Sequence, residues 1–400
     1  MTSLVLYDDA QARTFAPFAL TRPLGEMRAG VELIRRRWAS VTGAEVAGAI
    51  VAPHLEDFEE LDAPPALRAD VPAGAIVANT RCVVPLGMQA CDADVWTCAG
   101  RVAAVRVRSD VPAGRFDDGA PLESFASRGA RAREIPGRWL EHVWDFVAQL
   151  LPQLREDIEA LGPRLDCVPP EHATIIGSHA VYIERGATVE PLTCIDVSAG
   201  PVLVRAGASV RAFTRLVGPC AVASGATVQA ERVHGCSIGE MSIAHGELSE
   251  TVILGHANKS HDGFVGHSYL GRWVNLGAGT ITSNLKNTYG PVALWTPQGM
   301  QNTGMSKLGT FFGDHVKTGI GLRLTTGSVI GAGSNIYGSA MPPKHVPPFS
   351  WGQGDTLATY HLDQFLTVAE RAMARRGVAL GDRGRRQLAT AHTRSRSDIS

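Results

Sequence analysis

Large apolar residues recur at every sixth position through the second half of the chain. Twenty-three positions lie six apart from Val204 to Ile336, and fifteen of them carry Val, Leu, Ile, Phe or Met. The series includes Val204, Val210, Leu216, Val222, Val228, Phe264, Leu270, Leu276, Phe312, Leu324, Ile330 and Ile336. A period of six fits neither the 3.6-residue turn of a helix nor the alternation of an ordinary strand.

A period of six predicts a hexapeptide solenoid. Each hexad forms one short strand and a corner, about three hexads close a triangular coil, and the coils stack. Composition agrees, because 43 glycines and only 6% aromatic residues suit many turns around a narrow interior. The period weakens at His234, Glu240 and Gly246, and the polar stretch 283–310 predicts a loop that leaves the solenoid.

Five segments follow along the chain. Residues 1–135 predict a mixed α/β domain, with strands near 3–7, 74–77 and 102–107 and a helix near 29–39. An apolar stripe predicts a linker helix within 136–164, and a helix of the first domain is the alternative. We expect the solenoid at 165–350, a terminal helix at 351–378 and a polar, disordered tail at 379–400.

Charge and cysteine content exclude several classes of protein. The chain has 38 basic and 39 acidic side chains, so no basic excess indicates a nucleic-acid or anionic-membrane partner. Seven cysteines form no CxxC pair, which argues against a disulfide framework or a zinc knuckle. No signal peptide or long apolar run is evident, and we therefore expect a soluble cytoplasmic protein.

His261 is the candidate for catalysis that the period itself suggests. Five of the thirteen histidines fall between His234 and His267, and His261 is expected at a corner that points away from the interior. An imidazole there could act as a general base near neutral pH. The backbone N–H groups of Gly277, Ala278 and Gly279 could stabilise an oxyanion. A surface histidine without a catalytic role is the alternative.

The segment KSHDGFVGHSYLGRWVNLGAGTITSNLKNTYG (259–290) resembles the acetyltransferase centre of the bifunctional bacterial enzymes that make UDP-N-acetylglucosamine. The resemblance implies that His261 is the base and that Asn275 and Asn284 contact the sugar and acetyl groups. Phe264 stands where the family has a tyrosine, and Lys286 is the candidate to replace a family lysine.

The same resemblance implies a complete reaction and assembly. Acetyl-CoA would be the cosubstrate, and a hexosamine phosphate or a nucleotide-linked amino sugar would be the acceptor. The three backbone groups at 277–279 would shape the site for the acetyl group of coenzyme A. The solenoid would be a left-handed parallel β-helix, and the protein a homotrimer.

The segment YDDAQARTFAPFALTRPLGEMRAGVELIRRRW (7–38) resembles the opening of sugar nucleotidyltransferase-like domains. The family's Gly-rich phosphate loop is missing. By resemblance, Arg13 and Arg22 could hold phosphates, and Asp8 or Asp9 a Mg²⁺ ion. A domain that keeps only packing or sugar recognition is the alternative.

Three rival functions remain open. The first is a sugar-phosphate nucleotidyltransferase whose solenoid only regulates or trimerises. The second is a metalloenzyme similar to gamma carbonic anhydrases, suggested by His256, His261 and the segment VHGCSIGE (233–240). The third is a scaffold without activity. We favour acetyl transfer because the asparagines and glycines of 259–290 match in register.

Overall fold

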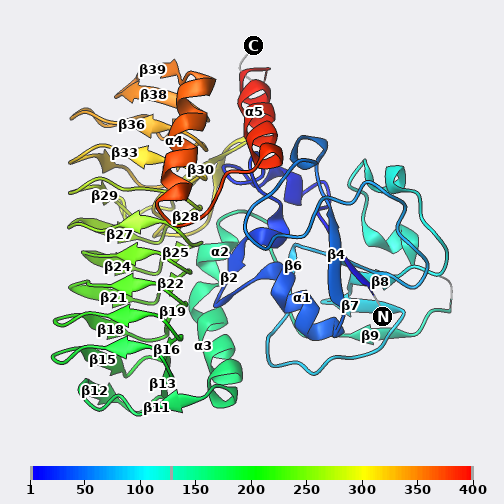
Figure 1. Ribbon diagram of the computed structural model, residues 1–400, viewed down its shortest axis with the longest axis horizontal. Helices are drawn as coiled ribbons and strands as arrows, with labels where there is room; N and C mark the ends of the chain where they lie inside the picture. The colour runs from blue at the N-terminus through cyan, green and yellow to red at the C-terminus, as the bar shows by residue number, and fades with distance from the viewer. Residues whose placement is uncertain (1–2, 127–128, 398–400) are drawn as a thin grey trace.

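The computed structural model describes residues 3–126 and 129–397. Figure 1 shows a stack of short strands on one side and an α/β domain on the other, with helices between them. The predicted architecture of an α/β domain, a parallel β-solenoid and a C-terminal helix is confirmed. Among the described residues, no helix combines the length and apolar character that crossing a membrane requires.

The N-terminal domain is built on a six-stranded sheet with the order β4-β1-β5-β8-β7-β9. Its strands are β1 (Ser3–Tyr7), β4 (Glu45–Ile50), β5 (Ile76–Asn79), β7 (Val95–Cys98), β8 (Arg101–Arg106) and β9 (Ala132–Glu134). The helix expected at 29–39 begins later, as α1 (Ile34–Thr42). A hairpin of β2 (Arg28–Ala29) and β3 (Glu32–Leu33) precedes it, with Gly30 at the turn in the left-handed conformation.

The solenoid has three faces, which the chain visits in the order 1, 2, 3. Face 1 is a ten-stranded sheet: β11 (Cys167–Val168), β13 (Val181–Glu184), β16 (Val202–Val204), β19 (Cys220–Val222), β22 (Ser237–Ile238), β25 (Val252–Ile253), β28 (Tyr269–Leu270), β32 (Phe311–Phe312), β35 (Val329–Ile330) and β37 (His345–Val346). All its neighbours pair in parallel except β11 with β13.

Face 2 and face 3 are interrupted near the insertion. Face 2 holds β14 (Thr188–Val189), β17 (Ser209–Val210), β20 (Thr227–Val228), β23 (Ile243–Ala244), β26 (Asn258–Lys259), β33 (Lys317–Thr318), β36 (Asn335–Ile336), β38 (Ser350–Gln353) and β39 (Thr356–Thr359). Face 3 holds β12 (Thr174–Gly177), β15 (Cys194–Val197), β18 (Arg215–Val217), β21 (Arg232–His234), β24 (Glu247–Ser249), β27 (Phe264–Gly266), β29 (Ile281–Thr282) and β34 (Arg323–Leu324).

The weakened period has a simple cause, because several coils are shorter than 18 residues. Ser237 pairs with Val252, only 15 positions later. The register therefore slips, and Ile253 and Val265 fill the interior where the six-residue count placed Val252 and Phe264. Val252 instead packs outward into the core shared with the N-terminal domain. Phe264 is half-buried on the outer surface of face 3, so its expected interior position was wrong.

The insertion expected at 283–310 is present as a hairpin of β30 (Ala293–Thr296) and β31 (Gly299–Asn302). Its base is not a loose loop, because Val292, Leu294 and Leu308 are fully buried. These side chains join the core that the solenoid shares with the N-terminal domain.

Two helices link the domains where one was expected. The segment contains α2 (Asp145–Ala148) and α3 (Leu150–Leu161), which meet at Gln149. Pro152 lies in the first turn of α3, where a missing N–H costs no hydrogen bond, so it does not kink the helix. The residues before α2 belong to the first domain, because β10 (Arg138–Trp139) pairs with β6 (Cys82–Val83).

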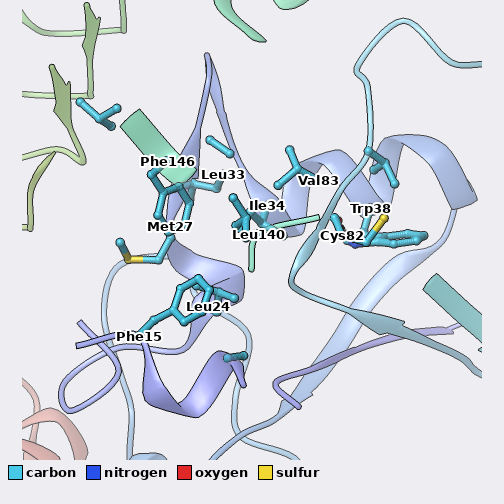
Figure 2. Close-up of a cluster of buried hydrophobic side chains, with 14 of the residues drawn as sticks. Phe15, Leu24, Met27, Leu33, Ile34, Trp38, Cys82, Val83, Leu140 and Phe146 are labelled. Carbon is cyan, nitrogen blue, oxygen red and sulfur yellow. Dashed lines mark hydrogen bonds between the residues drawn. The ribbon is translucent and has the colours of Figure 1, made fainter. Parts of the chain in front are cut away.

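One hydrophobic core joins the domain, the linking helices and the solenoid. Figure 2 shows its N-terminal part, in which Phe15, Leu24 and Met27 lie near Leu140 and Phe146. Tyr269 reaches into this core from face 1, and its ring centroid lies 4.8 Å from that of Phe18. Because face 1 is covered in this way, faces 2 and 3 carry the open surfaces of the solenoid.

The C-terminal segment differs from the expectation in two respects. The solenoid continues to β39, and the terminal helix begins only at Leu362, as α4 (Leu362–Ala374). The tail that we expected to be disordered forms α5 (Asp382–Ser397), which contacts α4 and the N-terminal domain. Leu388 and Ala391 bury their side chains against α4, which explains why a polar segment is ordered. Residues 398–400 of that tail lie outside the described residues.

Candidate functional site

His261 lies at the corner between faces 2 and 3, in the short segment that joins β26 to β27. It is exposed. The corner is held from within by Lys259, whose ammonium group donates to the backbone carbonyls of His245, His261 and Asp262. Lys259 is only 1% exposed, and burial lowers its pKa to about 8. The lysine thus anchors the segment that presents the imidazole.

Phe264 and Asn284 meet on the outer surface of face 3, above Gly266. A methyl group on Gly266 would lie 2.4 Å from Phe264 Cζ and 2.8 Å from Asn284 Nδ2. Both side chains therefore rest against the bare backbone of Gly266. His261 lies in the corner before β27, Phe264 is the first residue of β27, and Asn284 rests against Gly266, its last residue.

A ladder of polar side chains continues from Asn284 along the corner between faces 3 and 1. Asn284 Nδ2 lies 2.9 Å from His267 Nδ1, and His267 Nε2 lies 3.4 Å from Glu250 Oε2. His267 is 6% exposed, and burial lowers its pKa below the usual histidine value, with Glu250 opposing that shift. Sequence reasoning missed Glu250 and His267. Their spacing was a usable signal, because residues 250, 267 and 284 are separated by 17 positions, the length of one coil here.

Asn275 lies apart from this group, on face 2. It bridges Asn258 and Lys317 in the neighbouring coils, and its Oδ1 accepts a hydrogen bond from Asn258 Nδ2 at 2.7 Å. The structure therefore separates the two asparagines within one chain. Asn275 lies on face 2, on one side of the corner that carries His261. Asn284 lies on the other side of that corner, at the edge of face 3 that adjoins face 1.

The backbone donors proposed for an oxyanion are largely committed elsewhere. Gly277 N–H donates to the backbone and hydroxyl oxygens of Thr318, and Gly279 N–H donates to Asp262 O. These bonds join adjacent coils, so neither group is available to a ligand. Of the three residues proposed there, only the N–H of Ala278 stays a candidate. Lys286 is also engaged, because its Nζ donates to the Pro291 carbonyl of its own loop.

Asp8 and Asp9 follow β1, and the surrounding protein satisfies both carboxylates. Asp8 accepts from the Thr80 hydroxyl at 2.6 Å and from Leu24 N–H at 3.0 Å. Asp9 accepts from Arg81 at 2.7 Å and from Asn79 Nδ2 at 2.8 Å. Burial raises the pKa of Asp8 to about 6. Burial also acts to raise that of Asp9, but Arg81 holds it below its usual value.

This arrangement does not fit a Mg²⁺ site. Every carboxylate oxygen of the pair already accepts a hydrogen bond from the protein. A cation would have to displace Arg81 from Asp9 and the Thr80 hydroxyl from Asp8. The assignment of Asp8 or Asp9 as a magnesium ligand is therefore not supported by their geometry.

The guanidinium groups of Arg13 and Arg22 are also bound by other groups of the protein. Arg13 donates to the backbone carbonyls of Asp8, Phe116 and Asp117 at 3.0, 3.0 and 2.6 Å, which ties the turn after β1 to a neighbouring loop. These bonds give Arg13 a structural role, and they do not by themselves indicate a phosphate site.

Arg22 connects the two domains. It is 2% exposed, its Nη atoms bind both oxygens of Glu60 at 2.6 and 3.0 Å, and its Nε lies 3.1 Å from Asp314 of the solenoid. Burial acts to raise the pKa of Glu60, but the charges of Arg22 and Arg272 hold it at about 2. The proposed phosphate ligand is thus a structural clamp.

Histidines 256 and 261 are not joined in a metal centre. His256 Nδ1 lies 3.1 Å from the Arg272 guanidinium, a cation that a metal ligand would have to exclude. Within residues 3–126 and 129–397, His, Cys, Asp and Glu side chains form no group of three or more that could hold a metal ion.

Comparison with known proteins finds similarity to sugar nucleotidyltransferases and to bifunctional relatives. Residues 4–164 match a family model described as sugar nucleotidyl transferase. A bifunctional sugar-1-phosphate nucleotidylyltransferase/acetyltransferase of Sulfurisphaera tokodaii is 36% identical over 100 residues, which is 25% of each chain. The bifunctional protein GlmU of Bartonella quintana is 27% identical over 213 residues, covering 50% of this chain and 41% of its own.

These matches are partial. The chain spans only about a quarter of the length of the first curated relatives, 25% and 24% of the Sulfurisphaera tokodaii and Methanococcus vannielii proteins. A hexapeptide transferase family protein from Anaplasma phagocytophilum, solved as a crystal structure, aligns over 57% of this chain and 98% of its own, with 13% identity and a TM-score of 0.28. By sequence the chain is similar, over part of its length, to bifunctional proteins named GlmU and to a bifunctional sugar-1-phosphate nucleotidylyltransferase/acetyltransferase.

Proposed function

We propose that the protein transfers an acetyl group from acetyl-CoA to the amine of a hexosamine phosphate or a nucleotide-linked amino sugar, on the outer surface of face 3. The observation that carries the proposal is the meeting of Phe264 and Asn284 above Gly266, with the exposed His261 in the corner that precedes the same strand. The resemblance of 259–290 to an acetyltransferase centre supports the same assignment.

The proposed chemistry uses His261 as a general base. As the amine attacks the thioester carbonyl, a C–N bond forms and the imidazole accepts the amine proton. The tetrahedral oxyanion then collapses, the C–S bond breaks, and the imidazolium returns its proton to the departing thiolate. Asn284 orients the acceptor, and the N–H of Ala278 is the remaining backbone candidate near the oxyanion.

The proposal includes a homotrimer in the cytoplasm. Exposed apolar side chains gather at the corner between faces 2 and 3, where Leu192, Phe213 and Ile320 are 66%, 78% and 81% exposed. A second copy packed along this corner would cover them and bring other residues towards His261. Seven free cysteines fit a reducing compartment. Light scattering of the purified protein tests the oligomeric state.

The decisive experiment is His261→Ala, assayed with acetyl-CoA and glucosamine 1-phosphate by release of the coenzyme A thiol. Loss of a general base should lower turnover by about 10²–10⁴-fold, with circular dichroism and oligomeric state unchanged. His172→Ala, another exposed histidine, is the matched control. Turnover that survives His261→Ala would overturn the assignment. A panel of amino-sugar phosphates and nucleotide sugars then identifies the acceptor.

Nucleotidyl transfer is the second candidate, because residues 4–164 match the sugar nucleotidyl transferase model. The bonds of Arg13, Arg22, Asp8 and Asp9 argue that these four residues do not perform it. The assay is pyrophosphate release from each nucleoside triphosphate with sugar 1-phosphate and Mg²⁺. We expect no release above background. Release that survives Arg13→Ala would assign the activity to other residues of the domain.

A further inference from the structure

The ladder of Glu250, His267 and Asn284 occupies a column of the corner between faces 3 and 1 that favours glycine. Glu250 and His267 have φ angles of +46° and +49°, in the left-handed region. At the same corner in other coils, Gly177, Gly235 and Gly327 adopt this conformation. Residues other than glycine are unfavourable in this backbone conformation. The column therefore carries two polar side chains, Glu250 and His267, although their left-handed backbone conformation favours glycine.

The contacts of the ladder favour one arrangement of protons. A carboxylate only accepts, so Glu250 Oε2, which lies 3.4 Å from His267 Nε2 at ion-pair distance, favours the tautomer with the proton on Nε2. In the neutral ring Nδ1 is then an acceptor, and the group 2.9 Å away must be the NH₂ of Asn284. Because the carboxamide is planar, Asn284 Oδ1 is turned away from the imidazole.

We propose that His267 is a positioning residue, which Glu250 holds in one tautomer so that Asn284 presents its carbonyl oxygen, and not its NH₂, to the acceptor sugar. This inference rests on the proposed function and adds a rule of selectivity. The site would accept a donor group, such as the amine that becomes acetylated, and would discriminate against a group that can only accept.

The charges around His267 make this arrangement dependent on pH. Glu250 faces the ring, while His234 on β21 and Lys307 on the insertion act on it from neighbouring elements. Burial lowers the pKa of His267, with smaller contributions in the same direction from Lys307 and His234, so the neutral ring is favoured at pH 7. Protonation at lower pH would turn Nδ1 into a donor. Asn284 would then have to rotate and offer its NH₂ to the substrate.

The first test measures the tautomer directly and needs no substrate. In ¹⁵N-histidine-labelled full-length protein at pH 7.5, two-bond ¹H–¹⁵N spectra should show His267 with Nδ1 free and Nε2 protonated. His267→Asn assigns the signal, because asparagine tolerates a positive φ. Glu250→Gln should release the tautomer. A protonated Nδ1 in the wild-type protein would overturn the proposal.

The second test is kinetic, with acetyl-CoA and glucosamine 1-phosphate. Glu250→Gln should raise KM for the amino sugar about tenfold, roughly the value of one hydrogen bond, while kcat and KM for acetyl-CoA stay unchanged. Glu190→Gln, which removes a half-buried carboxylate bound to Arg211 on a distant coil, is the matched control.

The pH dependence of KM distinguishes a positioning role of His267 from a role in packing alone. KM for the amino sugar should rise below pH 6.5 in the wild type and should be flat in His267→Asn, whereas a packing role would lower stability and leave the pH dependence unchanged. A wild-type pH dependence in His267→Asn, or a fall in kcat alone in Glu250→Gln, would refute the proposal. Absence of any acetyl transfer would refute the proposed function, and the tautomer measurement would still decide the arrangement of His267.

Discussion

Two corners of the same solenoid place histidines in the same backbone conformation and give them opposite surroundings. At the corner between faces 1 and 2, His256, Trp273 and His315 have φ angles of +53°, +61° and +62°. At the corner between faces 3 and 1, Glu250 and His267 have nearly the same values. The first column lies under the N-terminal domain and α4, where Glu60 accepts from the Trp273 indole and His315 packs on Phe365.

The N-terminal domain and α4 cover the first column only, and this burial sets the protonation state of its histidines. Burial lowers the pKa of His256 to about 4 and that of His315 to about 3, so both are neutral packing groups. In the second column, Asn284 borders the outer surface of face 3, and a polar partner occupies each rung. Equal local backbone therefore does not imply an equal role. Contacts from distant parts of the chain bury the first column, and the second column is the one for which we propose ligand binding.

The largest expected effect comes from removing the clamp over the first column. Arg22→Ala leaves the carboxylates of Glu60 and Asp314 buried without their partner, and the free energy of unfolding should fall by about 3–5 kcal/mol. The midpoint of urea unfolding measures this loss. The exposed Arg323→Ala on face 3 is the control, and it should behave like the wild type.

Asn284→Ala makes the corresponding change in the second column, next to the open surface of face 3. Its unfolding midpoint should stay close to the wild-type value while acetyl transfer falls, since the side chain borders an open surface. A large loss of stability in Asn284→Ala, or none in Arg22→Ala, would contradict the division of roles between the two columns.

Acid should destabilise the protein through the covered column. The pKa values of His256 and His315 are lowered in the folded state, so the unfolded chain, with histidine values near 6.5, takes up protons first. This stability is fully present above pH 6.5 and is lost as the pH falls from 6.5 towards 4. His256 alone should account for about 3 kcal/mol at pH 4.

His315→Asn tests the acid effect, because asparagine keeps the left-handed backbone without an ionisable ring. The variant should lose less stability than the wild type between pH 6.5 and 4.5, as measured by urea unfolding at each pH. His172→Asn, at an exposed turn, should follow the wild-type curve. Equal acid sensitivity in His315→Asn would show that other groups dominate this pH range.

The smallest expected effect comes from filling the floor of the open site. Gly266→Ala would push a methyl group against Phe264 and Asn284, which can move outward, so KM for the amino sugar should rise about tenfold, near 1.4 kcal/mol. The unfolding midpoint should change little. Gly290→Ala, where the nearest atom is 3.9 Å away, is the control and should leave KM unchanged.

The period of six predicted the solenoid because inward and outward positions alternate regularly around a triangular coil. It could not predict coil length, and a coil of 15 residues moved Phe264 from the expected interior to the outer surface. The corner position of His261 survived this slip. The sequence did not predict that Asn284 contacts His267 and that His267 contacts Glu250, because these contacts can be predicted only once the length of each coil is known.

The α/β fold expected for the N-terminal domain is present, but the contacts of four charged residues do not support the ligand roles expected for them, for a different physical reason. Asp8, Asp9, Arg13 and Arg22 were selected as charged residues near the start of a sugar nucleotidyltransferase-like segment, and charged side chains suit phosphates and Mg²⁺ equally well. In the structure, Arg81 pairs with Asp9, Glu60 and Asp314 pair with Arg22, backbone carbonyls accept from Arg13, and Asp8 accepts from Thr80 and from Leu24 N–H. Composition shows that a charge exists, but it does not show which partner holds it.

By itself, the sequence determined the stacked coils, the inserted loop and the exposed corner that carries His261, since each depends on residues within one or two turns of one another. Only the tertiary structure decided which face is covered, which charges are consumed and which column stays open. Those outcomes depend on contacts such as Arg22 with Asp314, 292 positions apart, and short-range patterns carry no information about such pairs.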